Sequence, residues 1–419
     1  MTEAHQTPLE APPKGIFSKY RSLGLGTRIL IWMVIGAAAG MLFGERAAVV
    51  EPLGTLFIKL LMMAAIPLVF FNLLAGLTGL SDAATVGRLS ARLLVYFTLT
   101  TLFALSVGLT AAALLQPGRN MTLTESIQDD VGSVPGVVDL LLDFVPDNVF
   151  ASFASGNVVQ VVIFAVLLGI ATLALGPERR QQAANAYALG AELFRKLVDV
   201  VLLTAPLGIG ALTAVALGRY GDALFGPLGL FILGVIGGQI VVVALYWILL
   251  TTLSDWSPPR FLKETGTLWA TTAATCSSLA SLAVGLDVAE RMRFPQSVYG
   301  FTLPLGAQIN KDGTSVFLAM VLAFTAQAAG VEFTAGTIGM ALLIGLLLSQ
   351  GSAGIPGGGF VISLVLVQAF QLPLELAAIV GGIYRLVDIG NTTVNIMGDM
   401  VGTAIISRAE ERRLATEPA

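Results

Sequence analysis

Long apolar stretches alternate with short polar segments along this chain of 419 residues. A helix needs about 20 predominantly apolar residues to cross a bilayer. Residues 117–157 are polar and interrupted by proline, so they predict an external loop with short helical pieces. Several apolar stretches reach or approach the spanning length, and we predict that each is a membrane-spanning helix. They cover residues 29–43, 52–80, 93–115, 158–175, 188–217 and 224–253.

The apolar pattern changes after residue 258. Residues 271–281 read TTAATCSSLAS, and residues 348–359 read LSQGSAGIPGGG, where glycine and proline cannot continue a helix. Non-helical backbone persists at membrane depth only where protein buries it or water reaches it, and its amide and carbonyl groups are then free to meet a ligand. We therefore predict two re-entrant hairpins. For residues 271–281 an alternative stays open, because small and hydroxylated residues also serve close packing of membrane helices.

Each predicted hairpin is followed by an apolar stretch that contains polar side chains. The first polar segment, residues 301–314, reads FTLPLGAQINKDGT, and the second polar segment, residues 384–399, reads YRLVDIGNTTVNIMGD. A charge in hydrocarbon costs several kcal/mol unless it is paired or hydrogen-bonded, so these side chains predict a functional site between helices. Paired interrupted segments point to the binding site of a transporter. Structural ion pairs of Asp312, Asp388 or Asp399 are the alternative.

Composition assigns the chain to the polytopic membrane proteins. Hydrophobic residues make up 55% and charged residues 12% of the sequence, and mean hydropathy is +0.84; soluble domains carry roughly 25% charged residues. One cysteine, Cys276, excludes an intramolecular disulfide. One histidine, His5, excludes a histidine metal cluster and a Ser-His-Asp triad. The sequence has no G-x-x-x-x-G-K-[ST] phosphate loop, so ATP-driven transport is not expected. No nucleic-acid partner is predicted.

The distribution of basic residues predicts the orientation, because cytoplasmic loops carry an excess of lysine and arginine. Basic residues gather before the first span, after the second, between the fourth and fifth, around 260–293 and at the C-terminus. We expect a multi-pass protein of the cytoplasmic membrane with both termini in the cytoplasm. Residues 1–28 are polar and lack an apolar core, so we interpret them as a cytoplasmic arm and not as a signal peptide. Lys59 is interpreted as an interfacial lysine.

Four motifs resemble the glutamate-transporter homologues, the dicarboxylate/amino acid:cation symporter family. They are FTLPLGA at 301–307, N-x-DGT at 310–314, GSAGIPGGG at 351–359 and D-x-G-x-T-x-x-N-x-x-GD at 388–399. The resemblance implies an all-α fold of eight transmembrane helices and two re-entrant helical hairpins. It also implies a homotrimer in the lipid bilayer, with an elevator mechanism in which a fixed scaffold holds a moving transport domain.

The resemblance divides the chain as follows. After the arm at 1–28, scaffold helices 1 and 2 take residues 29–92, and transport-domain helix 3 takes residues 93–116. Scaffold helices 4 and 5, with the external loop, take residues 117–218. Helix 6, hairpin 1, helix 7, hairpin 2 and helix 8 take residues 219–419 and form the core of the transport domain.

The resemblance also implies an amino acid substrate. Ser278 and Asn395 would hold its α-carboxylate, and Asp388 would hold its ammonium, because a desolvated ammonium needs a counter-charge. Members that carry acidic amino acids have an arginine where this chain has Asn391, and loss of that bidentate fork costs an acidic substrate a few kcal/mol. We therefore expect a small neutral substrate such as serine, alanine, threonine or cysteine. The predicted substrate residues are Ser277, Ser278, Thr314, Ile355, Gly359, Asp388, Asn391, Thr392 and Asn395.

Two further points concern the same segment. The dicarboxylate branch of the family lacks an acid at the position of Asp388, which argues against succinate or malate. Arg385 lies one helical turn before Asp388. It is a possible charge partner of that acid, or it supplies the missing positive charge to the substrate from another angle.

Family position implies two cation sites built from oxygen donors, which suit a hard monovalent cation such as sodium. Lys311 replaces a methionine beside these sites, and Gln308 replaces a threonine near a further one. At about 4 Å and an effective dielectric constant near 20, an ammonium repels sodium by about 4 kcal/mol, or roughly a thousandfold in affinity. The implied sites are Gly306, Asn310, Asn395 and Asp399, and Thr100, Thr101, Asn310 and Asp312.

We hypothesise that Lys311 points inward between Asp312 and Asp399 and replaces at least one sodium ion, so that transport is proton-coupled or independent of sodium. Lys311 is also a candidate carrier of the coupled proton. The alternative is that Lys311 points away and either reaches the membrane surface or pairs elsewhere. No cofactor besides Na⁺ or H⁺ is expected.

Other functions stay open at this point. The first alternative is a sodium- or proton-coupled symporter of acidic amino acids or dicarboxylates. A channel is the alternative of another class, and saturable uphill uptake would separate the two. An intramembrane aspartyl protease, with Asp312 and Asp399 as its dyad, is the enzyme alternative; the glycine-rich hairpins and carboxamides suit the binding of a ligand better.

Overall fold

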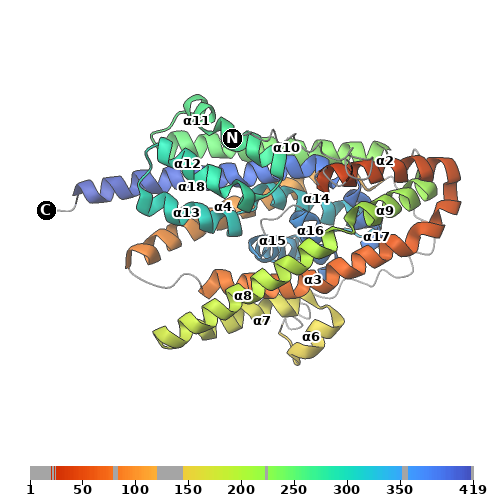
Figure 1. The fold of residues 1–419 in the computed structure, drawn as a ribbon, viewed down its shortest axis with the longest axis horizontal. Coiled ribbons are helices and arrows are strands. Elements are labelled where there is room, and N and C mark those ends of the chain that lie inside the picture. The colour runs from red at the N-terminus through yellow and green to blue at the C-terminus, as the bar shows by residue number, and fades with distance from the viewer. Residues whose placement is uncertain are drawn as a thin grey trace, which may run out of the picture.

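The computed structural model describes residues 20, 23, 25–78, 84–119, 145–221, 225–351 and 357–416. In these ranges every regular element is a helix and no strand occurs, which confirms the all-α prediction. The longer helices run along the longest axis of the molecule (Figure 1). The elements are α2 (Leu25–Phe43), η1 (Gly44–Val50), α3 (Glu51–Thr78), α4 (Ala84–Leu115), α6 (Val149–Ser155), α7 (Val158–Leu173), α8 (Pro177–Leu202), α9 (Ala205–Tyr220), α10 (Phe225–Leu253), α11 (Pro258–Thr275), α12 (Ser278–Arg291), α13 (Gln296–Ile309), α14 (Asp312–Ala328), α15 (Ala335–Gln350), α16 (Gly358–Ala369), α17 (Leu374–Gly381) and α18 (Tyr384–Thr416).

Three helical runs of the described chain are long and apolar enough to cross a membrane: Thr27–Thr78, Ala91–Leu115 and Phe225–Leu253. There is a fourth if α8 and α9 count as one span, although a bend of 57° separates them. The stretch predicted at 188–217 is thus divided into two helices, and its role as one span stays a prediction. Pro206 lies in the first turn of α9 and lacks the N–H that would continue α8. The count of eight spans stays a prediction.

The predicted external loop, residues 117–157, contains the short helix α6 in its described part. Asn148 begins this helix, because its side-chain oxygen accepts hydrogen bonds from the backbone N–H groups of Phe150 and Ala151. Residues 120–144 of the loop lie outside the described ranges.

Two groups of helices pack within themselves. In the first, α3 packs against α7, α8 and α9, and α2 lies along α9. In the second, α14 packs against α4, α10 and α18, and α13 lies against α18. The groups meet where α16 contacts α3 and α7 and where α17 contacts α9. The division into a scaffold and a transport domain, and any movement between them, stays a prediction.

Helix α14 lies at the centre of the second group. Of its 17 residues, only Gln327 is not buried. A helix that is apolar all round is expected to be enclosed by others. The ring of Phe317 lies 5.9 Å from that of Phe231 and 5.0 Å from that of Tyr384, measured between centroids. The aromatic contacts tie α14 to α10 and to the start of α18.

Both predicted hairpins contain the expected interruption of the helix. Cys276 and Ser277 separate α11 from α12, and Cys276 has a φ of 48°, in the left-handed region that favours glycine. Ser277 then caps α12 by accepting a hydrogen bond from the N–H of Ala280. In the second hairpin, α15 ends at Gln350 and α16 follows Gly357, whose φ is 83°. Re-entry of the hairpins into a membrane stays a prediction.

Close packing of α2 on α9 depends on glycine at position 36. A Cβ there would overlap the carbonyl oxygen of Gly210. We expect Gly36→Ala to lower the free energy of unfolding by about 1–3 kcal/mol, and thermal denaturation of the purified protein in detergent measures this. Gly76→Ala is the control, because a Cβ at Gly76 meets no atom within 4 Å. Equal melting temperatures for the two variants would contradict this packing.

Candidate functional site

The first polar segment forms a break between two helices. α13 ends at Ile309 and α14 begins at Asp312, and Asn310 between them has an extended backbone with φ −77° and ψ 123°. Carbonyl groups at the end of α13 and amide groups at the start of α14 thereby lose their helical partners. Buried backbone groups need other partners, and the two helix ends carry partial charges of opposite sign. The break is therefore a place where ions and polar groups bind.

Lys311 satisfies the carbonyl end of the break. Its ammonium donates to the carbonyl oxygens of Ala307, Gln308 and Asn310 at 2.9, 3.1 and 3.1 Å. An ammonium has three N–H donors, so each has a partner. The residue is 2% exposed, so Lys311 does not reach the membrane surface, and its pairing with backbone carbonyls agrees with the other form of the alternative, in which it pairs elsewhere.

The relation of Lys311 to the two acids differs from the hypothesis. Neutral carbonyl dipoles hold the ammonium, and within the described ranges no carboxylate forms an ion pair with it at 4.0 Å or less. Asp312 and Asp399 act on it electrostatically from a greater distance. Lys311 therefore binds the carbonyl groups at the end of α13, and the two carboxylates act on its ammonium from more than 4.0 Å.

Asp312 gathers one of the two predicted cation sets. Its Oδ1 accepts a hydrogen bond from the Thr101 hydroxyl at 2.7 Å, and its Oδ2 accepts one from the Tyr246 hydroxyl at 2.6 Å. The Thr100 hydroxyl is a further neighbour of this carboxylate, and Asn310 lies two residues before it. The structure thus brings Thr100, Thr101, Asn310 and Asp312 together around one buried acid.

Asp399 gathers the other predicted set. The Asn310 amide donates to Asp399 Oδ1 and to the backbone oxygen of Asn395, both at 2.9 Å. A Cβ at Gly306 would overlap Asp399 Oδ1, so glycine is required there for α18 to come this close to α13. These four residues therefore meet where α18 crosses the helix break.

Two oxygen atoms remain without hydrogen bonds at this crossing. Asn310 Oδ1 and Asp399 Oδ2 are both buried and have no partner among the described residues. A buried polar atom without a partner costs about 1–3 kcal/mol, so these two atoms are candidates for binding a cation or a proton. All the donors are oxygens, which fit sodium or a proton; the described ranges hold no cluster of three or more His, Cys, Asp or Glu for another metal.

Asn395 satisfies the amide end of the break. Its side-chain oxygen accepts hydrogen bonds from the backbone N–H groups of Gly313 and Thr314 at 2.8 and 3.2 Å. Its amide nitrogen donates to Thr314 Oγ1 at 3.0 Å. Asn395 therefore caps the start of α14, as an N-cap residue does, but from a different helix. Two predicted substrate residues, Thr314 and Asn395, are joined directly by this contact.

Asp388 presents one carboxylate oxygen to the site. Its Oδ1 accepts a hydrogen bond from the Tyr384 hydroxyl at 2.7 Å. Its Oδ2 is buried and makes no hydrogen bond to the described residues. The nearest Arg385 nitrogen lies 4.0 Å from Oδ2, at the limit of an ion pair. An ammonium group placed at Oδ2 would meet an acceptor and a negative charge together.

The helix ends of both hairpins meet the second polar segment. In the first hairpin, the Thr272 and Thr393 hydroxyls lie 3.2 Å apart, and Cys276 is a neighbour of Asp388. In the second, the backbone of Gly357 approaches Asp388.

The remaining predicted substrate residues are placed as follows. Gly359 lies against the Tyr384 hydroxyl and Thr314, where a Cβ would crowd both. Ser278 and Thr392 are buried, at 3% and 4% exposure. Ile355 lies outside the described residues. The substrate roles of all these residues stay predictions.

The sequence profile of the sodium:dicarboxylate symporter family matches residues 25–409. The chain belongs to this family. It is therefore a membrane symporter, and the family is one of transporters and not a class of enzyme.

Characterised relatives cover nearly the whole symporter. It is 28% identical over 391 residues to a proton/glutamate-aspartate symporter of Bacillus subtilis, covering 92% of this chain and 94% of the relative. It is 28% identical over 413 residues to a proton/sodium-glutamate symport protein of Bacillus caldotenax, covering 93% and 95%. It is 30% identical over 390 residues to a C4-dicarboxylate transport protein of Edwardsiella ictaluri, covering 91% of each. Coupling by protons or sodium is thus found among the relatives.

Sequence reasoning missed four residues that support the site. Tyr246 bonds Asp312, Tyr384 bonds Asp388, and the Tyr96 hydroxyl donates to the backbone oxygen of Gly398 at 3.1 Å. The fourth, Gln239, donates to Asn391 at 2.8 Å. Tyr96, Gln239 and Tyr246 are polar groups within long apolar helices, and that isolation was the available signal, whereas Tyr384 begins the second polar segment.

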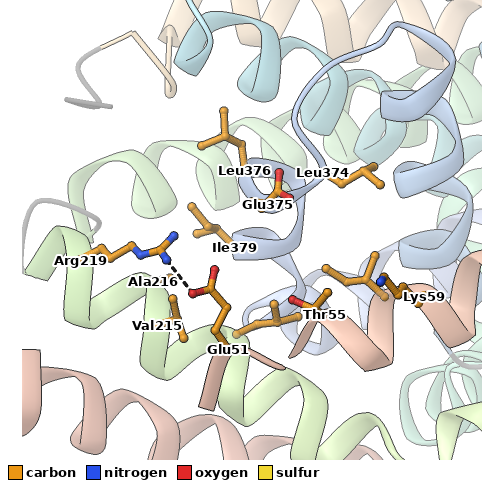
Figure 2. A pocket seen from close by; sticks show the side chains of 12 residues that line it. Glu51, Thr55, Lys59, Val215, Ala216, Arg219, Leu374, Glu375, Leu376 and Ile379 are labelled. Atoms are coloured by element: carbon orange, nitrogen blue, oxygen red, sulfur yellow. Dashed lines mark hydrogen bonds and ion pairs between the residues drawn. The ribbon is translucent and has the colours of Figure 1, made fainter. Parts of the chain in front are cut away.

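A separate cavity of about 210 Å³ lies between α3, α9 and α17 (Figure 2). At one end of it Glu51 and Arg219 form an ion pair at 2.7 Å, and Lys59 and Glu375 also line it. None of the predicted substrate or cation residues lines this cavity. This cavity is therefore separate from the buried polar network that forms the candidate site.

The Tyr246 hydroxyl gives a direct test of the network around Asp312. We expect Tyr246→Phe to lower the free energy of unfolding by about 1–3 kcal/mol, because Asp312 Oδ2 then loses its partner. Tyr299→Phe is the matched control, since the hydroxyl of Tyr299 makes no hydrogen bond to the described residues. Chemical denaturation followed by tryptophan fluorescence measures both variants. An equal loss in the two would contradict the assigned role of Tyr246.

Proposed function

We propose that this symporter carries a small neutral amino acid, with coupling altered to protons or freed from sodium. One observation supports the substrate: Asp388 and Asn391 lie three residues apart on α18, and residues at this spacing share a face of a helix. Asp388 Oδ2, buried without a hydrogen bond to the described residues, suits an ammonium group. Asn391 is fully buried and neutral, which suits an uncharged side chain.

The main alternative is a sodium- or proton-coupled symporter of acidic amino acids or dicarboxylates, as the names of the relatives suggest. An acidic side chain would need a permanent positive charge near Asn391. Arg385 is the basic residue closest in sequence, and its guanidinium lies 4.0 Å from Asp388. We assign Arg385 to Asp388 as a neighbouring charge at the limit of an ion pair, and not to the side chain of the substrate. A channel is the alternative of another class, and saturable accumulation of substrate against a gradient would exclude it.

Lys311 is the basis of the proposed coupling. Three carbonyl oxygens surround its ammonium, and oxygen donors of this kind also bind sodium. One of them belongs to Asn310, which is common to both predicted cation sets. We propose that Lys311 acts as a cation tethered to the protein, which replaces at least one sodium ion and is a candidate carrier of the coupled proton.

An elevator movement of a homotrimer in the cell membrane, with both termini in the cytoplasm, completes the proposal. Support for the movement comes from the location of the site residues: all the described ones lie on α4, on α10 or on later helices. They would therefore travel together against α2, α3, α7, α8 and α9.

A competition panel tests the substrate. Purified symporter in proteoliposomes is expected to accumulate a neutral amino acid such as serine, and aspartate, glutamate and succinate should compete weakly. Uptake of a dicarboxylate in preference to any neutral amino acid would contradict the proposal.

Asn391→Arg is expected to raise the affinity for aspartate relative to serine by about 10- to 100-fold, because a bidentate ion pair replaces a neutral amide. Competition binding measures the ratio. Asn391→Gln is the matched control, since it lengthens the side chain without adding charge. If both variants leave the ratio of aspartate to serine unchanged, Asn391 does not contact the substrate side chain.

Lys311→Met is expected to make transport depend on sodium. The substitution frees the carbonyl oxygens of Ala307, Gln308 and Asn310 and removes a repulsion worth roughly a thousandfold in sodium affinity. Uptake with and without a sodium gradient, at fixed membrane potential, measures the change. Lys59→Met, at an exposed lysine, is the control. Full dependence of uptake on sodium in the native symporter would contradict the proposal that Lys311 replaces a sodium ion.

A further inference from the structure

Gln239 is a buried amide in the middle of an apolar helix. It is 6% exposed and lies on α10, a helix otherwise composed mainly of aliphatic, aromatic and glycine residues. An amide without hydrogen bonds at such a site would cost several kcal/mol. Its Nε2 donates to Asn391 Oδ1 at 2.8 Å. The contact crosses from α10 to the face of α18 proposed to bind the substrate.

The place of Gln239 is fixed by a close approach to α18. A Cβ at Gly390 would overlap Gln239 Oε1, so glycine is needed there for this side chain to fit. The same contact indicates which way the amide faces. The oxygen lies over the Gly390 Cα, where a C–H···O contact is tolerated. In the reverse orientation an N–H₂ group would face carbon and lack an acceptor.

The hydrogen bond from Gln239 decides what Asn391 can offer. Its Oδ1 is occupied, whereas its Nδ2 is buried without a hydrogen-bond partner in the described part of the chain. The Tyr384 hydroxyl lies beside Asn391, but Nδ2 carries two N–H donors, so at least one is left for a ligand. The side-chain end of the proposed site therefore presents a donor and no acceptor from this residue.

We propose that Gln239 is a positioning residue that sets substrate specificity. By holding the Asn391 oxygen, it turns the Asn391 N–H₂ toward the side chain of the substrate. The site then selects amino acids whose side chain ends in an oxygen acceptor, a hydroxyl or a carboxamide, over those that end in a methyl or an ammonium group. This inference rests on the proposed function, because it assumes that Asn391 faces the side chain of an amino acid.

Matched ligands isolate this effect in the full-length symporter. Serine and alanine differ by one hydroxyl, and 2,3-diaminopropionate replaces that hydroxyl with an ammonium group. We expect the native protein to bind serine at least about tenfold more tightly than alanine or 2,3-diaminopropionate, as one hydrogen bond to a buried donor allows. Displacement of radiolabelled serine measures all three.

Gln239→Met keeps the length of the side chain and removes its donor. It is expected to reduce the preference for serine over alanine to about twofold or less and to improve the binding of 2,3-diaminopropionate relative to serine. General damage to the fold would instead weaken all three ligands together. Gly390→Ala is a second variant, which displaces Gln239 without changing either amide, and it should act in the same direction. Gln327→Leu is the control, because its amide bonds Ala112 and Gly118, away from the site.

The two proposals fail in different ways. If native protein binds none of these amino acids but binds succinate, the proposed function is wrong and this inference falls with it. If native protein binds amino acids and loses them in Asp388→Asn, the proposed function stands. In that case, an absent preference for serine, or a preference unchanged in both Gln239→Met and Gly390→Ala, overturns the role of Gln239 alone.

Discussion

The break between α13 and α14 is the feature on which the rest of the site depends. An uninterrupted helix satisfies its own backbone, but this break exposes carbonyls at one end and amides at the other, inside the protein. Lys311, which lies within the break, binds its carbonyl end, and Asn395, which lies on α18, binds its amide end. Because the second contact requires α18 to cross at this point, it also brings Asp399 to the break.

The network is incomplete in a specific way. Asn310 Oδ1, Asp399 Oδ2, Asp388 Oδ2 and Asn391 Nδ2 are buried without hydrogen bonds to the described residues. Each lowers the stability of the symporter in the form seen here, and a bound cation or solute would restore it. A transporter needs this kind of arrangement, because polar atoms that are all hydrogen-bonded within the protein could not bind a solute or an ion.

A second ring of residues fixes the first. Tyr246, Tyr384, Thr101 and Gln239 each use one hydrogen bond to orient an acid or an amide of the site. All four side chains are buried or lie among buried residues, so packing restricts their rotation. Because these side chains rotate little, each acid or amide of the site keeps the same donor or acceptor turned toward a solute.

The sequence by itself determined the helical class, the interruptions of both hairpins and the two polar segments, because apolar length, glycine, proline and buried charge are local signals. The resemblance of its motifs to a family also grouped two sets of residues that the structure brings together, and their role as cation sites stays a prediction. Only the tertiary structure decided that α8 and α9 are separate helices, that the ammonium of Lys311 donates to backbone carbonyl oxygens, and that Gln239 holds Asn391. The Gln239–Asn391 contact joins residues 152 positions apart, and no spacing along the chain encodes it. The break before Pro206 and the bonds of Lys311 to carbonyls one to four residues before it are local, but they depend on the path that the backbone takes at each break, which apolar length and residue type do not report.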